Sequence, residues 1–151
     1  MFEAIGRYHL KDDCLTNAEH QTIVCTTNCV GAMGRGIALT FKQKYPRVYR
    51  EYRKRYMSGL LKPNYLFTVP LSDKQQVLMF PTKIDWKRPS PEGLIYDNLR
   101  VLEEELDELQ IDSMALPPLG LANGWVRNRA NVYLAMYEVL GRLPIRCTLY
   151  Y

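Results

Sequence analysis

The sequence has few of the residues that metal sites and disulfide frameworks require. It contains only two histidines and four cysteines, and no two cysteines form a CxxC pair. Neither residue type has the spacing of a zinc finger or zinc ribbon, so we expect neither a metal nor another cofactor. The cysteines are most simply interpreted as buried thiols in a reducing compartment.

Long apolar segments are also lacking. No apolar run is long enough to cross a membrane, and the first residues lack the charged and then apolar regions of a signal peptide. The 151 residues, 47% hydrophobic and 24% charged, match the size and composition of one ordinary domain with a core of its own. We therefore expect a single domain over residues 1–151, monomeric and cytoplasmic, with no membrane partner.

Hydrophobic patterning predicts that strands alternate with helices. We expect strands over 2–10, 21–27, 65–69, 76–80, 111–116 and 145–150, and helices over 37–45, 46–57, 91–109 and 127–140. Ser90 is expected to cap the third helix with Pro91 in its first turn, and Gly141 to end the fourth. The third and fourth strands are interpreted as a hairpin or as neighbours. This order predicts an α/β fold, with a largely parallel sheet covered by helices on both faces.

The net charge of +4 is the balance of two oppositely charged segments. Residues 35–62 contain nine Lys or Arg and one acid, Glu51, whereas residues 92–112 contain eight acids and one cation, Arg100. Either segment alone is typical of a solvated helix face, but beside a binding site the basic one would suit an anionic partner. The tyrosines of the basic segment's second helix are interpreted as packing residues rather than base-stacking residues: Tyr49, Tyr52 and Tyr56.

Three loops of suitable composition follow predicted strands, at residues 28–36, 81–88 and 117–124. Ligands bind beyond the carboxyl ends of strands in such sheets. The first loop carries Gly34 and Gly36 directly before a helix, which would bring backbone N–H groups and the helix dipole to a phosphate. It is neither a Walker loop nor a GxGxxG motif. With a second small, flexible loop at 119–124, the pair favours a pyrophosphate ligand.

Three segments together resemble the macrodomains of the DarG class. They are TNCVGAMGRGIALTFK at 27–42, FPTK at 80–83 and ALPPLG at 115–120, in family order, and the likeness covers nearly the whole chain. The resemblance implies a three-layer α/β/α macrodomain, with a central mixed, largely parallel sheet, that binds ADP-ribose. For DarG-like members it implies a bacterial or phage-encoded glycohydrolase that removes ADP-ribose from thymidine bases of single-stranded DNA and so opposes the toxin DarT.

The resemblance also implies a set of site residues. Lys83 matches the catalytic lysine, and Asn28 is expected against the distal ribose. The other expected substrate-binding residues are Gly34, Arg35, Gly36, Ile37, Thr82, Leu119, Gly120, Leu121, Ala122, Asn123 and Gly124. Asp13 is the candidate for reading adenine, because the usual Gly-Asp dipeptide is missing. Trp86, Lys87 and Arg88 are expected to contact nucleic acid.

The chemistry of an amine supports a catalytic role for Lys83 independently of the resemblance. An amine attacks an anomeric carbon, or holds an opened sugar as a Schiff base, only when it is unprotonated. Its pKa must therefore fall through burial or through nearby cations, for which Lys87 and Arg88 are the expected sources. No acid lies between Asp112 and Glu138. Because relatives that pair the lysine with an aspartate carry the acid in that region, the sequence favours a mechanism that relies on the lysine.

Two other functions remain open. The same pair of loops would suit a glycohydrolase or phosphatase acting on protein carboxylate esters or on ADP-ribose 1''-phosphate. It would also serve a non-catalytic reader of ADP-ribose, because Leu121 and Ala122 replace the usual Cys-Gly of the second loop. Lys83 favours catalysis over reading.

Overall fold

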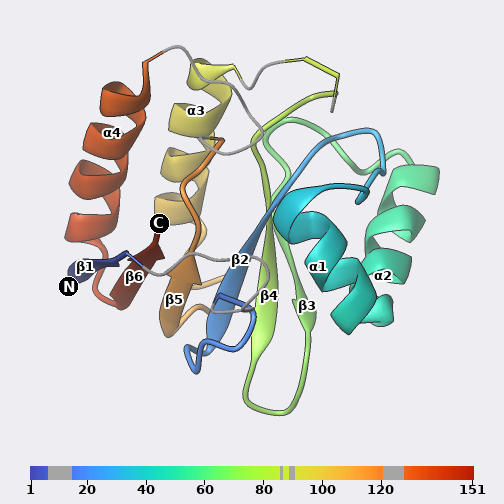
Figure 1. Cartoon of the computed structure of the whole chain (residues 1–151), viewed down its shortest axis with the longest axis horizontal. Helices are drawn as coiled ribbons and strands as arrows, with labels where there is room; N and C mark the ends of the chain where they lie inside the picture. The colour runs from blue at the N-terminus through green and yellow to red at the C-terminus, as the bar shows by residue number, and fades with distance from the viewer. Residues whose placement is uncertain (7–14, 86, 89–90, 121–127) are drawn as a thin grey trace.

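The computed structural model describes residues 1–6, 15–85, 87–88, 91–120 and 128–151 (Figure 1). The strands are β1 (Phe2–Ile5), β2 (Thr22–Thr27), β3 (Phe67–Pro70), β4 (Gln76–Pro81), β5 (Ser113–Leu116) and β6 (Arg146–Tyr150). The helices are α1 (Gly36–Lys44), α2 (Pro46–Met57), α3 (Glu92–Glu104) and α4 (Arg129–Arg142).

The strands form one mixed sheet in the order β1-β6-β5-β2-β4-β3. All neighbouring pairs are parallel except β3 and β4, which are antiparallel. The largely parallel sheet is therefore confirmed, and of the two arrangements expected for the third and fourth strands, the hairpin is the one found. β2 lies between β4 and β5, with Thr27 opposite Pro81 in the register with β4.

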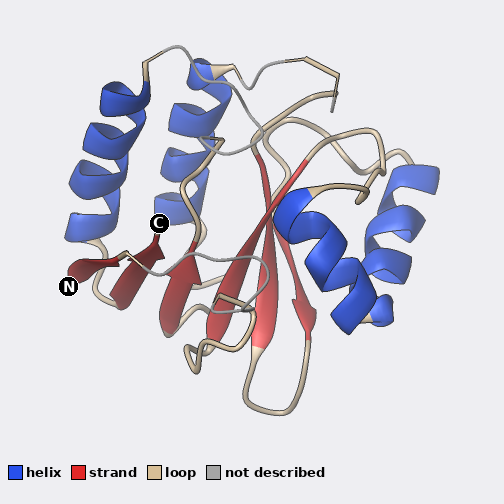
Figure 2. Cartoon of the chain, in the orientation of Figure 1, coloured by secondary structure: helices blue, strands red, loops and turns tan. Residues whose placement is uncertain are grey.

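Helices cover both faces of the sheet, as Figure 2 shows. Alternate residues of β2 point to opposite faces, as the geometry of a strand requires. Val24 packs in the core beneath α3 and α4, whereas Ile23 and Cys25 pack in the core beneath α1 and α2. The expected three-layer α/β/α arrangement is therefore confirmed. Within the described residues, none of the helices combines the length and apolar character that membrane crossing requires.

Several predicted element boundaries were wrong. α3 ends at Glu104, because the chain turns before Leu106 and Ile111 enter the core, so it does not reach Leu109. Pro91 is the N-cap of α3, and Ser90 lies outside the described residues. Gly141 is inside α4, which continues to Arg142. The first strand ends at Ile5, and the rest of the range expected for it lies outside the described residues or in a bend.

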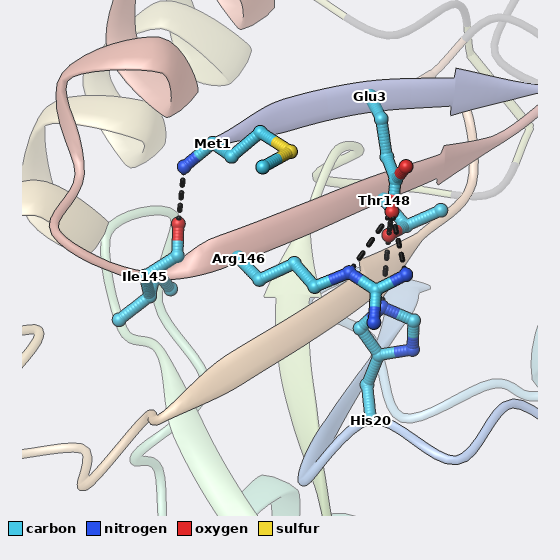
Figure 3. Close-up of polar contacts among 6 residues, drawn as sticks. All are labelled: Met1, Glu3, His20, Ile145, Arg146 and Thr148. Atoms are coloured by element: carbon cyan, nitrogen blue, oxygen red, sulfur yellow. Dashed lines mark hydrogen bonds and ion pairs between the residues drawn. The ribbon is translucent and has the colours of Figure 1, made fainter.

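The edge strand β1 is joined to β6 by a polar network as well as by backbone pairing (Figure 3). Arg146 donates two hydrogen bonds to one carboxylate oxygen of Glu3, at 2.7 and 2.9 Å. The Thr148 hydroxyl donates to the same oxygen at 2.9 Å, so the His20 Nε2 atom, 2.8 Å from that hydroxyl oxygen, must be the donor to it. These hydrogen bonds hold the pKa of Glu3 below its ordinary value.

Core packing of the α3 layer can be tested with two leucines. Leu102 on α3 is completely buried, whereas Leu134 on α4 is 58% exposed. Leu102→Ala should lower the free energy of unfolding by about 2 to 5 kcal/mol, because it leaves a cavity. Leu134→Ala should change it by less than about 0.5 kcal/mol. Urea unfolding measures both, and equal losses would contradict this packing of α3.

Candidate functional site

The carboxyl ends of three neighbouring parallel strands bring three loops to one edge of the sheet (Figure 1). The β2 loop comprises residues 28–35, the β4 loop residues 82–85, and the β5 loop residues 117–120. These residues fall within the three loops that the sequence singled out, although Pro81 belongs to β4 and Gly36 to α1. The parallel pairing of β2 with both neighbours is what makes them adjacent.

Backbone hydrogen bonds tie the β2 loop to the β4 loop. The N–H groups of Thr82 and Lys83 both donate to the carbonyl of Thr27, at 3.0 and 3.3 Å. In return, the N–H of Cys29 donates to the carbonyl of Ile84 at 3.0 Å. Thr82 is buried and Lys83 is half-buried. The expected catalytic lysine therefore leaves the sheet beside the start of the glycine-rich loop.

Asn28 folds the β2 loop around its own side chain. Its Oδ1 atom accepts hydrogen bonds from the N–H of Val30 at 3.1 Å and of Ala32 at 3.3 Å. Its Nδ2 atom donates to the carbonyl of Ala32 at 2.9 Å. These three bonds make the 8% exposed side chain the centre of a tight turn.

Tyr52 of α2 fixes Asn28 from the helix layer. Its hydroxyl lies 2.6 Å from the Asn28 carbonyl and 2.8 Å from Oδ1. Tyr52 is completely buried, and burial raises the pKa of its hydroxyl, so the group remains a donor. Because Oδ1 accepts from the N–H groups of Val30 and Ala32, the carboxamide orientation is set, and the single hydroxyl proton of Tyr52 lies within reach of both Asn28 oxygens. A carboxamide nitrogen carries two N–H groups, and one of them is given to Ala32.

The end of the β2 loop presents the amino terminus of α1. Arg35 is the N-cap but makes no side-chain capping bond, and the first turn contains no acid. Gly36 has a φ of +58°, a conformation that favours glycine. A Cβ atom built on the exposed Gly34 would meet nothing within 4 Å among the described residues. The first turn of α1 therefore carries neither a capping side chain nor an acid that would compete with an anion for its N–H groups and dipole.

The pKa of Lys83 is lowered, as its expected chemistry requires. Burial is the larger cause, and the positive charge of Arg35 on the β2 loop is the second. The prediction that Lys87 and Arg88 supply this charge was wrong. Both residues are exposed, in a turn where Asp85 accepts the N–H of Lys87 at 2.9 Å and that of Arg88 at 3.3 Å.

The β5 loop is described only to Gly120. Leu119 and Gly120 are buried, and Gly120 has a φ of +71°. Five expected binding residues and one expected nucleic-acid contact lie outside the described residues: Leu121, Ala122, Asn123, Gly124, Asp13 and Trp86. The described chain resumes at Asn128, whose N–H donates to Glu92 of α3 at 2.9 Å.

Sequence reasoning missed the supporting role of α2. Tyr52 was interpreted as a packing residue, which its burial bears out, but its hydroxyl also holds the binding loop. Tyr56 is 39% exposed, and its ring lies against the backbone of Gly31. The sequence could have indicated the role of Tyr52 only through chemistry, because the hydroxyl of a buried tyrosine needs a hydrogen-bond partner. The sequence does not show which loop supplies it.

A hollow of about 380 Å³ lies away from this edge of the sheet. It is lined by residues before β2, by the end of α1 and by the β3–β4 turn, at the amino ends of the strands. Lys44 bonds there to Thr16 and Asn17, and Gln75 bonds to Ala18 and His20. Because these polar groups bond to one another, and because none of the lining residues belongs to the β2, β4 or β5 loop, we place the functional site at the opposite edge.

No three His, Cys, Asp or Glu side chains gather as a metal site within the described ranges. Cys25 and Cys147 are buried free thiols, as expected, and Cys29 is a half-buried free thiol whose pKa burial raises.

Comparison with known proteins identifies the family. The Macro domain family model matches residues 24–131. A DNA ADP-ribosyl glycohydrolase of Mycobacterium tuberculosis is 40% identical over 113 residues, which are 73% of this chain and 32% of that protein. A homologue of the same name from Thermus aquaticus is 37% identical over 113 residues, which are 73% of this chain and 31% of that protein. The chain therefore spans about a third of the length of these curated relatives.

Solved structures agree with this match. The macrodomain of Mycobacterium tuberculosis DarG superposes with a TM-score of 0.87 at 32% identity, covering 99% of this chain and 97% of that one. Thermosipho africanus DarTG in complex with ADP-ribose superposes with a TM-score of 0.80 at 30% identity, covering 87% of this chain and 38% of that one. On the evidence of its sequence and its fold, the chain belongs to the macrodomain family.

Proposed function

We propose that this macrodomain is an ADP-ribosyl glycohydrolase that removes ADP-ribose from thymidine bases of DNA. One observation carries the proposal: a lysine with a lowered pKa lies beside a glycine-rich loop that opens onto a helix amino terminus. The named activity of the relatives from Mycobacterium and Thermus supports the same substrate.

The amino terminus of α1 would hold the pyrophosphate. Its first-turn N–H groups face no acid of their own helix, and Arg35 adds a positive charge beside them. Asn28 would lie against the distal ribose. Its Oδ1 atom already accepts from the N–H groups of Val30 and Ala32, so Asn28 offers the second N–H of Nδ2 to a sugar oxygen.

Lys83 would carry the chemistry. Its unprotonated amine forms a bond to the anomeric carbon as the bond from that carbon to the thymine nitrogen breaks. The base leaves with the electron pair and takes up a proton. Water then releases the ribose from the amine, which regenerates Lys83. Burial and Arg35 increase the unprotonated fraction of the amine at neutral pH.

Lys83→Ala tests this role. We expect loss of ADP-ribose release from modified DNA, with binding of free ADP-ribose retained, because the side chain acts on the anomeric bond. Lys74→Ala, in the exposed β3–β4 turn, is the matched control and should keep the activity. Turnover is measured by chromatography of released ADP-ribose and binding by calorimetry. Hydrolysis by the Lys83→Ala variant would remove Lys83 from the mechanism.

The substrate is tested by offering three modified molecules in parallel to the wild-type protein. These are single-stranded DNA with ADP-ribosylated thymidine, a protein modified on carboxylates, and ADP-ribose 1''-phosphate. We expect release from DNA. Release from one of the other two alone would replace the proposed substrate, and binding without release from any would indicate a reader.

The pH dependence tests the contribution of Arg35. Activity should rise with pH as Lys83 loses its proton. Arg35→Gln removes a neighbouring positive charge, which raises the pKa of Lys83 and moves the rising limb to higher pH. Arg35→Lys keeps a charge and should leave the limb closer to that of the wild type. If the rising part of the pH–activity profile of Arg35→Gln stays in place or moves to lower pH, Arg35 does not lower the pKa of Lys83.

A further inference from the structure

The layer formed by α1 and α2 is almost free of acids. Residues 28–72 contain nine Lys or Arg and a single acid, Glu51. The carboxylate of Glu51 is engaged by Arg55 at 2.9 Å. The acidic segment of the sequence lies instead on and after α3, in the opposite layer. A polyanion that approaches the site is therefore attracted to the α2 side of the molecule.

Three cations of α2 share one exposed face. Arg47, Arg50 and Lys54 occur at positions i, i+3 and i+7, which places them on one side of the helix, and all three are exposed. At 1.5 Å per residue they extend over about 10 Å of the helix. This row provides charges spaced along a line rather than a pocket for a single anion.

Two further residues connect this row to the site. Arg53 donates to the carbonyl of Gly31 in the β2 loop at 3.2 Å, and its guanidinium lies 5.0 Å from the centre of the Tyr56 ring. A Cβ atom on Gly31, whose φ is +74°, would come within 2.9 Å of the same ring. Tyr56 therefore lies against the β2 loop while 39% of its surface remains exposed.

We propose that the DNA strand beside the modified thymidine crosses α2 obliquely, from the exposed row of cations past Arg53 to Tyr56. Arg47, Arg50 and Lys54 contact its phosphates, and a neighbouring base stacks on Tyr56. Tyr56 lies about half a turn around the helix from Arg47, but Arg47, Arg50, Arg53 and Tyr56 follow one another at i+3 spacing and form a ridge that winds from the row to the ring. Cations beside an exposed aromatic ring are what single-stranded nucleic acid uses for binding. An acidic peptide would use the charges but would leave the aromatic surface without a base. The proposal takes its substrate class from the proposed function.

The salt dependence of strand binding tests the charged row. The probe is a fluorescein-labelled, unmodified single-stranded oligothymidylate, and the measurement is anisotropy from low to high salt. Removing one cation that pairs with a phosphate reduces the slope of log K against log salt by about 0.7 for single strands. R50Q/K54Q should therefore bind more weakly, with a slope shallower by about 1.4. The matched control K74Q/R100Q removes two exposed cations from the β3–β4 turn and α3 and should keep the wild-type slope.

Two substitutions of one residue test the stacking. Tyr56→Leu keeps an apolar side chain against Gly31 but removes the ring, and should weaken strand binding by about five-fold or more. Tyr56→Phe keeps the ring and should bind like the wild type. Circular dichroism of each variant checks that the fold is retained.

Several results would overturn the proposal. They are equal slopes for R50Q/K54Q and the wild type, equal losses in both double variants, unchanged binding by Tyr56→Leu, and tighter binding of oligouridylate or of an acidic peptide than of the DNA strand. The assay uses unmodified DNA and no turnover. Its failure is therefore separate from a failure of the proposed function, which would appear as modified DNA that is bound but never hydrolysed.

Discussion

The parallel pairing of β2 with both β4 and β5 is the constraint on which the site depends. A parallel strand ends at the same edge as its neighbours, so the three loops that follow these strands must start side by side. The carbonyl of Thr27 extends the pairing beyond the strands by accepting the N–H groups of Thr82 and Lys83. The position of the lysine is therefore set by main-chain hydrogen bonds, which do not depend on the surrounding side chains.

The β2 loop is held differently, by side chains. Asn28 supplies its internal hydrogen bonds, and Tyr52 and Arg53 hold it from α2. The helix layer thus serves two purposes at once. Its inner face fills the core beneath the sheet, while the hydroxyl of Tyr52 and the guanidinium of Arg53 fix the β2 loop. A change in α2 would reach the ligand through these two contacts.

Much of this arrangement can be predicted from the sequence, because periodicity and loop composition report local structure. The six strands, the four helices, the hairpin and the glycine-rich start of α1 follow from such patterns. Contacts between distant segments do not. The spacing of residues in the sequence does not show that Arg35 lowers the pKa of Lys83, 48 positions away. It does not show the hydrogen bond from Tyr52 to Asn28 either. Lys87 and Arg88 are the cations nearest to Lys83 in the sequence after it, but in the fold it is Arg35 that lowers the pKa of Lys83. The end of α3 at Glu104 was missed because leucines continue at helical spacing after the helix has ended.

The electrostatic effect of Arg35 on Lys83 would also link proton binding to the proposed anion binding. An anion held at the start of α1 offsets the positive charge of Arg35 and so makes the protonated form of Lys83 less unfavourable. By reciprocity, protonation of Lys83 strengthens the attraction for that anion. An occupied site therefore holds more protons than an empty one at the same pH. Burial, the larger cause of the lowered pKa of Lys83, would then be what keeps part of the amine unprotonated while an anion is bound.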